Sequence, residues 1–195
     1  MANASSGGSR RGIDPDYVLW AVMALPGLWM IACGFLNIKI PYVGWSGILA
    51  CWFIVLAMLV TPAMMLYRPL IWLKPKRRYF GVAGFAYTLL HLAFWAYNLK
   101  PGGITASFTR PKILVGWIAF FILVPLALTS FDRAVRALGP RCKTLQRWVY
   151  PAAFFTLLHW LTTADSLRIV ILSSLPVIVL SAWRLIRWQS RTRAA

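Results

Sequence analysis

Long apolar runs separated by short polar or basic segments dominate this chain. Six such runs are found, at residues 17–37, 44–67, 79–98, 112–130, 148–164 and 168–187. An α-helix rises about 1.5 Å per residue, so about 20 apolar residues cross a hydrocarbon core of about 30 Å. The pattern therefore predicts an all-α polytopic membrane protein. We expect a six-helix transmembrane bundle over residues 17–187, with a flexible tail at 1–16 and a basic tail at 188–195.

The composition supports a lipid environment. Of the 195 residues, 60% are hydrophobic and only 13% are charged, against about 25% charged in a typical soluble domain. The chain also contains 11 Trp, a residue whose amphipathic ring is enriched at membrane–water interfaces. The lipid bilayer is therefore the first predicted partner, and the length suits one domain.

The charge is strongly basic, with 21 Lys and Arg, four acidic residues and a formal net charge of +17. Nucleic-acid binding would need a soluble basic face. Here the basic residues instead form short clusters between apolar runs, as in the cytoplasmic loops of membrane proteins. The pattern argues against a nucleic-acid partner.

The distribution of these charges predicts an orientation. With a cytoplasmic N-terminus and six spans, both termini are cytoplasmic and the outer side holds only five basic residues: Lys39, Lys100, Arg110, Lys112 and Arg168. The inner side then holds sixteen: Arg10, Arg11, Arg68, Lys74, Lys76, Arg77, Arg78, Arg133, Arg136, Arg141, Lys143, Arg147, Arg184, Arg187, Arg191 and Arg193. This is a strong positive-inside bias.

Two histidines, the only ones in the chain, are the main candidates for chemistry. His91 lies thirteen residues into the third span, counted from Tyr79, and His159 lies twelve residues into the fifth, counted from Trp148. Both spans run outward, so both imidazoles are expected roughly 17–18 Å above the inner edge, in the outer half of the bilayer. Imidazole is costly in hydrocarbon unless it is paired or ligated.

Two interpretations of the histidines remain open at this point. Each could simply hydrogen-bond a neighbouring helix, as polar residues do in membrane bundles, or the two could clamp a haem iron from opposite sides. The four acids, Asp14, Asp16, Asp132 and Asp165, all lie near span ends or in loops, whereas cation transporters and proton pumps usually need carboxylates in the bilayer. A zinc site would want a third ligand. Bis-histidine haem is the simplest remaining chemistry.

A family resemblance extends this argument. The runs KPKRRYFGVAGFAYTLLHLAFW, TRPKILVGWIAFFILVPLALTSFDRAVRALGPR and LQRWVYPAAFFTLLHW resemble the ferric-reductase-like transmembrane group. Within that group, they resemble the haem-binding membrane subunits of periplasmic methionine sulfoxide reductase systems, the MsrQ family. The similarity covers roughly residues 44–165. It implies a b-type haem bundle in a bacterial inner membrane, with His91 and His159 as the haem ligands.

The resemblance also implies partners. In that family, electrons pass from a cytoplasmic flavin or quinol donor to a periplasmic molybdopterin enzyme that repairs oxidised methionine. The chain has no nucleotide-binding glycine-rich motif, so we expect an electron-transfer subunit that depends on a cytoplasmic flavin reductase or quinol. We do not expect an enzyme sufficient by itself.

The sequence departs from the family at the inner end of the fifth span. The family usually has an L-H-x-x-V-Y run there, whereas this chain has LQRWVY, which places Gln146 thirteen residues before His159. Arg78 lies thirteen residues before His91. Glutamine is a poor iron ligand and arginine is none, so we expect one haem b near the outer face. A bound FMN or quinone near Arg77, Arg78 and Gln146 could bridge the inner gap.

Other roles remain open for the basic residues and for the whole chain. Arg110 could pair with a haem propionate or be an ordinary interface arginine, and Arg77 and Arg78 could be positive-inside anchors. A transporter or channel that uses the histidines as polar or proton-relay groups is one alternative function. A non-catalytic haem-handling assembly factor is another.

Overall fold

The computed structural model describes residues 14–164 and 166–193. The regular secondary structure of these residues is entirely helical, in this order: α1 (Pro15–Phe35), α2 (Tyr42–Leu66), η1 (Arg68–Trp72), α3 (Leu73–Tyr97), α4 (Gly103–Ser107), α5 (Pro111–Leu128), α6 (Asp132–Leu138), α7 (Pro140–Gln146), α8 (Val149–Thr163) and α9 (Leu167–Arg193). Asp165 and the first thirteen residues of the predicted N-terminal tail lie outside this description.

Each of the six predicted apolar segments contains a helix, and four of these helices are long and apolar enough to cross a membrane. These are α1, α2, η1 together with α3, and α5. Helix α8 has only 15 residues, and the apolar part of α9 covers Leu167–Leu180. The structure therefore confirms an all-helical protein with several apolar helices, and the count of six spans stays a prediction.

Helix α3 begins at Leu73, six residues before the predicted start of the third span. The cause is general: hydropathy detects the apolar part of a helix, whereas the backbone hydrogen bonds continue through the basic run Lys74–Arg78. The three short helices α4, α6 and α7 lie in connections where the sequence pattern predicted no element. Only two residues, Arg147 and Trp148, separate α7 from α8.

The chain divides into two units, residues 1–38 and 39–195, which are described separately. The first unit contains α1, whose start is stabilised by Asp14. The Asp14 carboxylate accepts a hydrogen bond of 2.9 Å from the Asp16 amide, and Pro15 occupies the first helical position. Both features are typical of helix N-termini.

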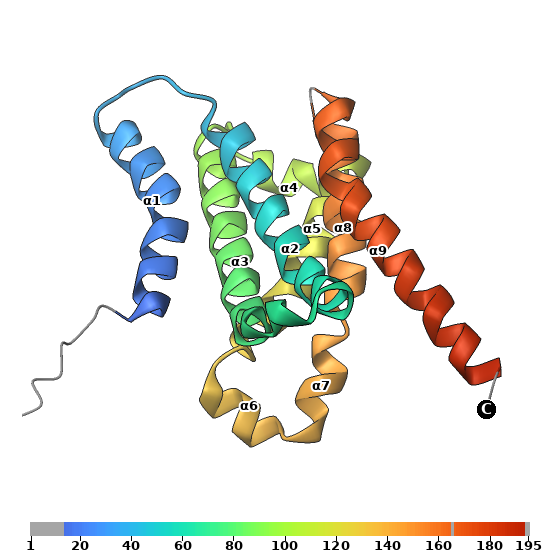
Figure 1. Cartoon of the computed structure of the whole chain (residues 1–195). Helices are drawn as coiled ribbons and strands as arrows, with labels where there is room; N and C mark the ends of the chain where they lie inside the picture. Colours follow the sequence, from blue (N-terminus) through green and yellow to red (C-terminus); the bar gives the residue numbers. More distant parts are fainter. Residues whose placement is uncertain (1–13, 165, 194–195) are drawn as a thin grey trace, which may run out of the picture. The chain divides into compact units, whose positions relative to one another are not determined.

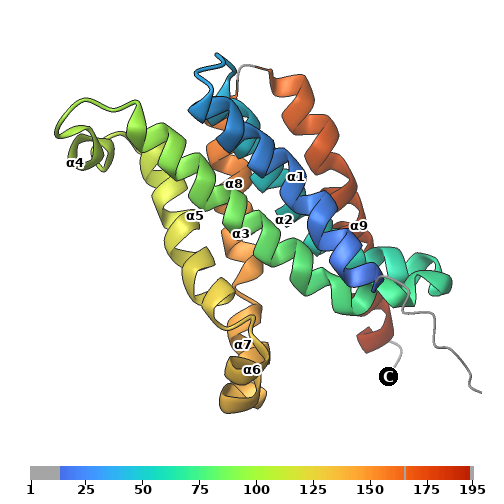
Figure 2. The ribbon, with the colours of Figure 1, turned by 90° about the vertical axis from the view of Figure 1, so that its left-hand side faces the viewer.

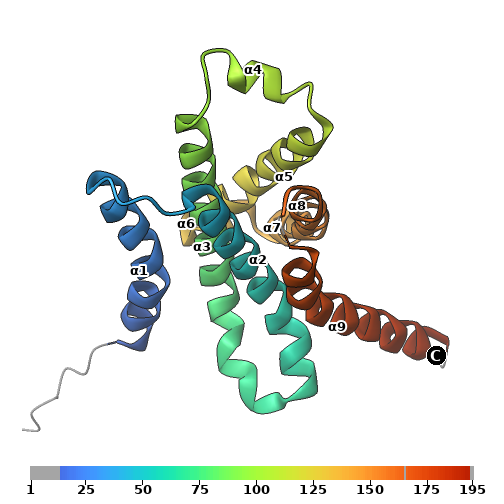
Figure 3. The same cartoon turned by 90° about the horizontal axis from the view of Figure 1, so that it is seen from above.

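The second unit is an antiparallel arrangement of five long helices (Figure 1). Helices α2, α5 and α9 run in one direction, and α3 and α8 run in the other. Helix α4 lies at one end of this unit and the α6–α7 segment at the opposite end (Figure 2). Seen along the helices, α2 pairs with α3, and α5 pairs with α8 (Figure 3). The two histidine-bearing helices, α3 and α8, are thus parallel.

Helices α2 and α3 approach each other closely at Gly84. A Cβ atom added to Gly84 would lie 2.9 Å from Cγ1 of Ile54 and 3.3 Å from its backbone nitrogen. Phe53 and Tyr87 stack beside this contact, with ring centres 5.3 Å apart. Small residues allow close backbone approach between membrane helices, where dispersion replaces the hydrophobic effect as the attraction.

A buried cluster of Ile54, Leu123, Ala152 and Ala153 joins α2, α5 and α8, and Phe85 of α3 packs against it. Helix α9 packs on the other side of α2, where Trp52 Nε1 donates a 3.0 Å hydrogen bond to Ser173 Oγ. Phe85 and Ala153 each lie six residues before the histidine of their helix, in α3 and α8. The cluster therefore holds the helices together on the α6–α7 side of the two histidines.

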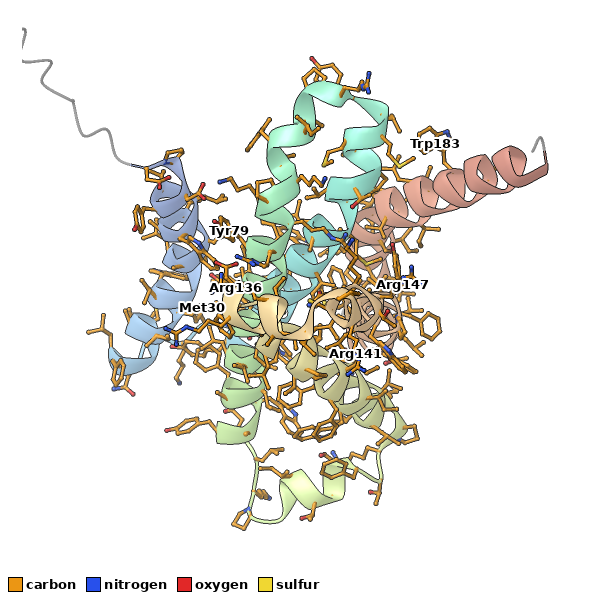
Figure 4. All side chains as sticks on the ribbon, turned by 90° about the horizontal axis from the view of Figure 1, so that it is seen from below. Met30, Tyr79, Arg136, Arg141, Arg147 and Trp183 are labelled. Atoms are coloured by element: carbon orange, nitrogen blue, oxygen red, sulfur yellow. The ribbon has the colours of Figure 1, made fainter. Side chains whose placement is uncertain are left out.

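Basic side chains are concentrated at the α6–α7 end of residues 39–195. The described Lys and Arg residues near that end are Arg68, Lys74, Lys76, Arg77, Arg78, Arg133, Arg136, Arg141, Lys143 and Arg147. Figure 4 views this end and labels Arg136, Arg141 and Arg147, which belong to α6, α7 and the residues just before α8. The opposite end holds five: Lys39, Lys100, Arg110, Lys112 and Arg168.

The Gly84 contact yields a stability prediction. Gly84→Ala should destabilise the protein by about 1–3 kcal/mol, because the new methyl group must displace Ile54 or the α2 backbone. Gly81→Ala in the same helix is the matched control, since a Cβ atom there meets nothing within 4 Å. Thermal unfolding in detergent should show a lower midpoint for Gly84→Ala alone. Equal midpoints for the two variants would contradict the contact.

Candidate functional site

The structure brings the two histidines together. His91 of α3 and His159 of α8 face each other with ring centres 6.5 Å apart and ring planes at 76°. The two histidines come from different helix pairs, since α3 packs against α2 and α8 packs against α5. The side chains are partly buried, so neither imidazole is an exposed surface group.

Each imidazole is oriented by a backbone carbonyl of the neighbouring helix. Nδ1 of His91 lies 2.9 Å from the Val43 carbonyl oxygen, and Nδ1 of His159 lies 2.8 Å from that of Lys112. A carbonyl only accepts hydrogen bonds, so Nδ1 is the donor in both contacts. In the neutral ring, Nε2 then carries the free lone pair, as it does in metal-ligating histidines whose Nδ1–H is held by the protein.

The spacing of the rings fits one metal ion between them. A metal–imidazole bond is about 2.0 Å, and each ring nitrogen is roughly 1.1 Å from the ring centre, so opposed ligands have centres about 6.2 Å apart. The observed value is 6.5 Å. Among the described residues, no group of three or more His, Cys, Asp or Glu side chains is placed to hold a metal. A flat macrocycle that supplies the remaining ligands fits this two-imidazole arrangement.

A cavity of about 460 Å³ surrounds the two rings, within the usual size range of about 300–1,000 Å³ for small-molecule and cofactor sites. Its walls come from α2, α3, α5, α8 and the start of α9, and Leu123 belongs both to the wall and to the buried cluster beneath it. Most lining residues are apolar or aromatic, among them Ile48, Ala50, Trp95, Trp117, Phe120 and Trp160.

Three threonines, Thr88, Thr156 and Thr163, line the cavity, and the hydroxyl of each donates a hydrogen bond to a carbonyl of its own helix. Thr88 Oγ1 donates to the Gly84 carbonyl, and Thr156 Oγ1 donates to the Ala152 carbonyl, each at 2.8 Å within its own helix. Because these hydroxyl protons are already donated, the three threonines offer no free hydroxyl donor to the cavity. The walls therefore suit a flat, apolar cofactor better than a hydrated ion.

Aromatic side chains form the wall between α3 and α5. Trp117 stacks on Phe108, with ring centres 4.9 Å apart, and meets Trp95 edge-on. Trp117 Nε1 donates a 2.9 Å hydrogen bond to Oγ of the buried Ser107. This bond ties α4 to the cavity wall, so the connection between α3 and α5 also contributes to the site.

The other three residues predicted from the sequence lie elsewhere. Among the described residues, none of Arg110, Arg78 and Gln146 belongs to the cavity lining. Arg110 is exposed at the start of α5. Arg78 forms an ion pair of 2.6 Å with Asp132, at the end of the bundle that holds α6 and α7.

The Gln146 side chain also forms hydrogen bonds at the α6–α7 end. Its Nε2 donates to the Leu126 carbonyl at 3.2 Å and to Thr129 Oγ1 at 3.3 Å. Gln146 thus connects α7 to the end of α5, just as Arg78 connects α3 to α6. The side chains at the two positions thirteen residues before the histidines therefore form contacts within the chain.

Two glycines that the sequence reasoning missed support the imidazoles. A Cβ atom at Gly47 would lie 2.9 Å from Nδ1 of His91, and one at Gly116 would lie 2.9 Å from Nδ1 of His159. A signal was present in the sequence: the run TLLH occurs at residues 88–91 and again at 156–159. This short repeat predicts equivalent surroundings for the two histidines, although it does not locate the glycines.

The fold defines a helical membrane protein in which two histidines face each other in an apolar cavity, and comparison with known proteins identifies its family. Residues 46–164 match the family described as ferric reductase like transmembrane component. The MsrQ haem-binding subunit of the protein-methionine-sulfoxide reductase from Brucella anthropi is 32% identical over 99% of this chain and 93% of its own length. The same subunits from Brucella ovis and Brucella suis are 33% identical over 97% of this chain and 93% of their lengths.

The chain therefore belongs to the MsrQ family, within the ferric-reductase-like transmembrane proteins. No solved structure gives a significant match. The family expectation drawn from the sequence motifs is confirmed.

The Arg78–Asp132 pair yields a prediction on pH. The Arg78 guanidinium donates a hydrogen bond to Asp132 and attracts its charge, which holds the pKa of that carboxyl below its usual value. A lowered folded-state pKa stabilises the fold above the ordinary pKa of about 3.9, and the contribution disappears as the pH falls through the lowered value.

Asp132→Asn should therefore lower the thermal midpoint slightly at neutral pH and not at strongly acidic pH. The effect is small, because the two side chains are 39% and 67% exposed. Unfolding midpoints of both proteins across the acidic range, at low and high salt, measure it. A midpoint difference that is unchanged in acid would show that the ion pair does not contribute to stability.

Proposed function

We propose that this protein is a haem-binding, electron-transfer subunit of the membrane, and that His91 and His159 are the two axial ligands. The observation that carries the proposal is the pair of facing imidazoles, 6.5 Å apart, with both Nδ1 atoms bound to carbonyls, inside an apolar cavity. The relatives are named as haem-binding subunits, which supports the same cofactor here.

The residues of the cavity would have separate tasks. The two imidazoles would offer Nε2 lone pairs from opposite sides, and the aromatic and aliphatic walls would exclude water. When bound, haem supplies a one-electron couple, and two imidazoles at its axial positions leave no position for a substrate. We therefore infer a relay of electrons as the role of this chain, with the substrate chemistry on a partner.

A single haem of the b type is the form that these residues support. The sequence contains no CxxC motif for covalent attachment. The positions of Arg78 and Gln146, where the wider family could hold a second ligand pair, make contacts with Asp132 and with Leu126 and Thr129. A flavin or quinone near this end remains our proposal for the inner electron carrier.

We infer that electrons enter at the basic α6–α7 end and leave at the α4 end. The basic concentration matches a cytoplasmic face, and the carbonyls that hold the histidines belong to the second residues of α2 and α5, close to the opposite end. A cytoplasmic flavin reductase or quinol would be the donor. The relatives are named as subunits of a protein-methionine-sulfoxide reductase. Such a reductase, on the periplasmic side, would be the acceptor.

Absorption spectra test whether the protein binds haem through the two histidines. Purified protein from haem-supplied cells should show an intense Soret band and, after dithionite reduction, a sharp α band. His91→Ala and His159→Ala should each remove nearly all of this haem, because each deletes one axial ligand. Gln146→Ala is the control and should keep the spectrum of the wild type. Colourless wild-type protein would refute the proposal, and haem loss in Gln146→Ala alone would refute the ligand assignment.

Reporter fusions test the proposed topology of six spans, with both termini cytoplasmic and residues 17–187 as the membrane domain. Alkaline phosphatase, which is active only outside the cytoplasm, should be active when inserted after Lys100 and inactive when inserted after Gly139. Green fluorescent protein at the C-terminus should fluoresce. The reverse pattern at the two insertion points would overturn the inferred direction of electron transfer.

A further inference from the structure

Gly47 and Gly116 occupy equivalent positions beside the two imidazoles. Gly47 lies four residues after Val43, whose carbonyl holds His91, and Gly116 lies four residues after Lys112, whose carbonyl holds His159. At both glycines, the added Cβ atom would be 2.9 Å from Nδ1. The same arrangement thus occurs twice, on two different helix pairs.

The spacing of four residues between each carbonyl and its glycine has a physical reason. In an α-helix, the carbonyl of residue i bonds to the amide of residue i+4, and the side chain of residue i+4 leans back over that carbonyl. A carbonyl oxygen has a second lone pair, which can accept a further hydrogen bond. With glycine at i+4, that lone pair is open to a donor from a neighbouring helix, and an imidazole can reach it.

A methyl group at either glycine would separate the ring from its acceptor. Besides Nδ1, a Cβ atom at Gly47 would lie 3.1 Å from Cε1 of His91, and one at Gly116 would lie 3.0 Å from Cε1 of His159. These are ring atoms on a short side chain, which cannot bend away as the end of a long side chain can. The imidazole would have to swing off the carbonyl, with loss of the hydrogen bond.

We propose that Gly47 and Gly116 are positioning residues that set the donor strength of His91 and His159, and through it the reduction potential of the bound haem. The inference rests on the proposed function. A hydrogen bond from Nδ1–H to a carbonyl makes the ring a stronger electron donor at Nε2, which favours the oxidised metal. Loss of one such bond therefore raises the potential.

Potentiometric titration of purified holoprotein tests this inference. Gly47→Ala and Gly116→Ala should each shift the ratio of oxidised to reduced haem by about threefold to tenfold toward the reduced form, and a tenfold change equals about 59 mV for one electron. Gly81→Ala is the control. It adds the same methyl group to α3, where a Cβ atom meets nothing within 4 Å, so the haem potential of this variant should equal that of the wild type.

A second measurement needs no variant. Haem iron with two imidazole ligands is diamagnetic when reduced, so proton spectra of the reduced wild-type holoprotein should contain two Nδ1–H signals that exchange slowly with solvent. If the alanine variants fail to fold or to retain haem, this measurement still tests the two hydrogen bonds on which the inference rests. Rapid exchange of both signals would overturn the inference.

The results of these experiments distinguish a failure of this inference from a failure of the proposed function. Wild-type protein without haem would refute the proposed function itself. Haem-containing Gly47→Ala and Gly116→Ala variants with unchanged potentials, or a Gly81→Ala shift as large as theirs, would refute only the role of the two glycines. A rise in potential in both glycine variants with an unchanged control would establish it.

Discussion

The hydrogen bond from a histidine Nδ1–H to a helix backbone carbonyl is the contact on which the site depends. It occurs twice, at 2.9 Å to Val43 and at 2.8 Å to Lys112. Each bond selects the ring tautomer that leaves Nε2 free, and each fixes the direction in which that lone pair points. Without these bonds the two imidazoles would be polar groups in an apolar cavity, with no defined separation.

The rest of the bundle maintains this pair of bonds. Each imidazole reaches across to the partner of its own helix, so the α2–α3 and α5–α8 pairs must stay at close distance. Gly84 and the buried Ile54, Leu123, Ala152 and Ala153 achieve this on the α6–α7 side of the histidines. At the α6–α7 end, the contacts of Arg78 and Gln146 join the same helices to the intervening segment. The Trp117–Ser107 bond ties α4 to the cavity wall.

Much of the architecture follows from elementary patterns. Apolar runs of the right length locate the six main helices, and matched distances from the span ends place His91 and His159 at one depth. Hydropathy does not find α4, α6 and α7, because short helices in polar connections have no apolar period. It also misplaces the start of α3, because the helix continues through a basic run that hydropathy excludes. Arg110 was a candidate by depth, yet it lies outside the cavity lining among the described residues.

The sequence by itself determined the class of protein and the family, and it singled out the two histidines as candidate ligands, since periodicity, charge asymmetry and motif order are all linear properties. Only the tertiary structure decided which groups orient those histidines. Val43, Gly47, Lys112 and Gly116 lie more than forty residues from the imidazoles that they contact. Their role comes from the close approach of two helices, and no local pattern in a single chain records which carbonyl a neighbouring side chain will reach.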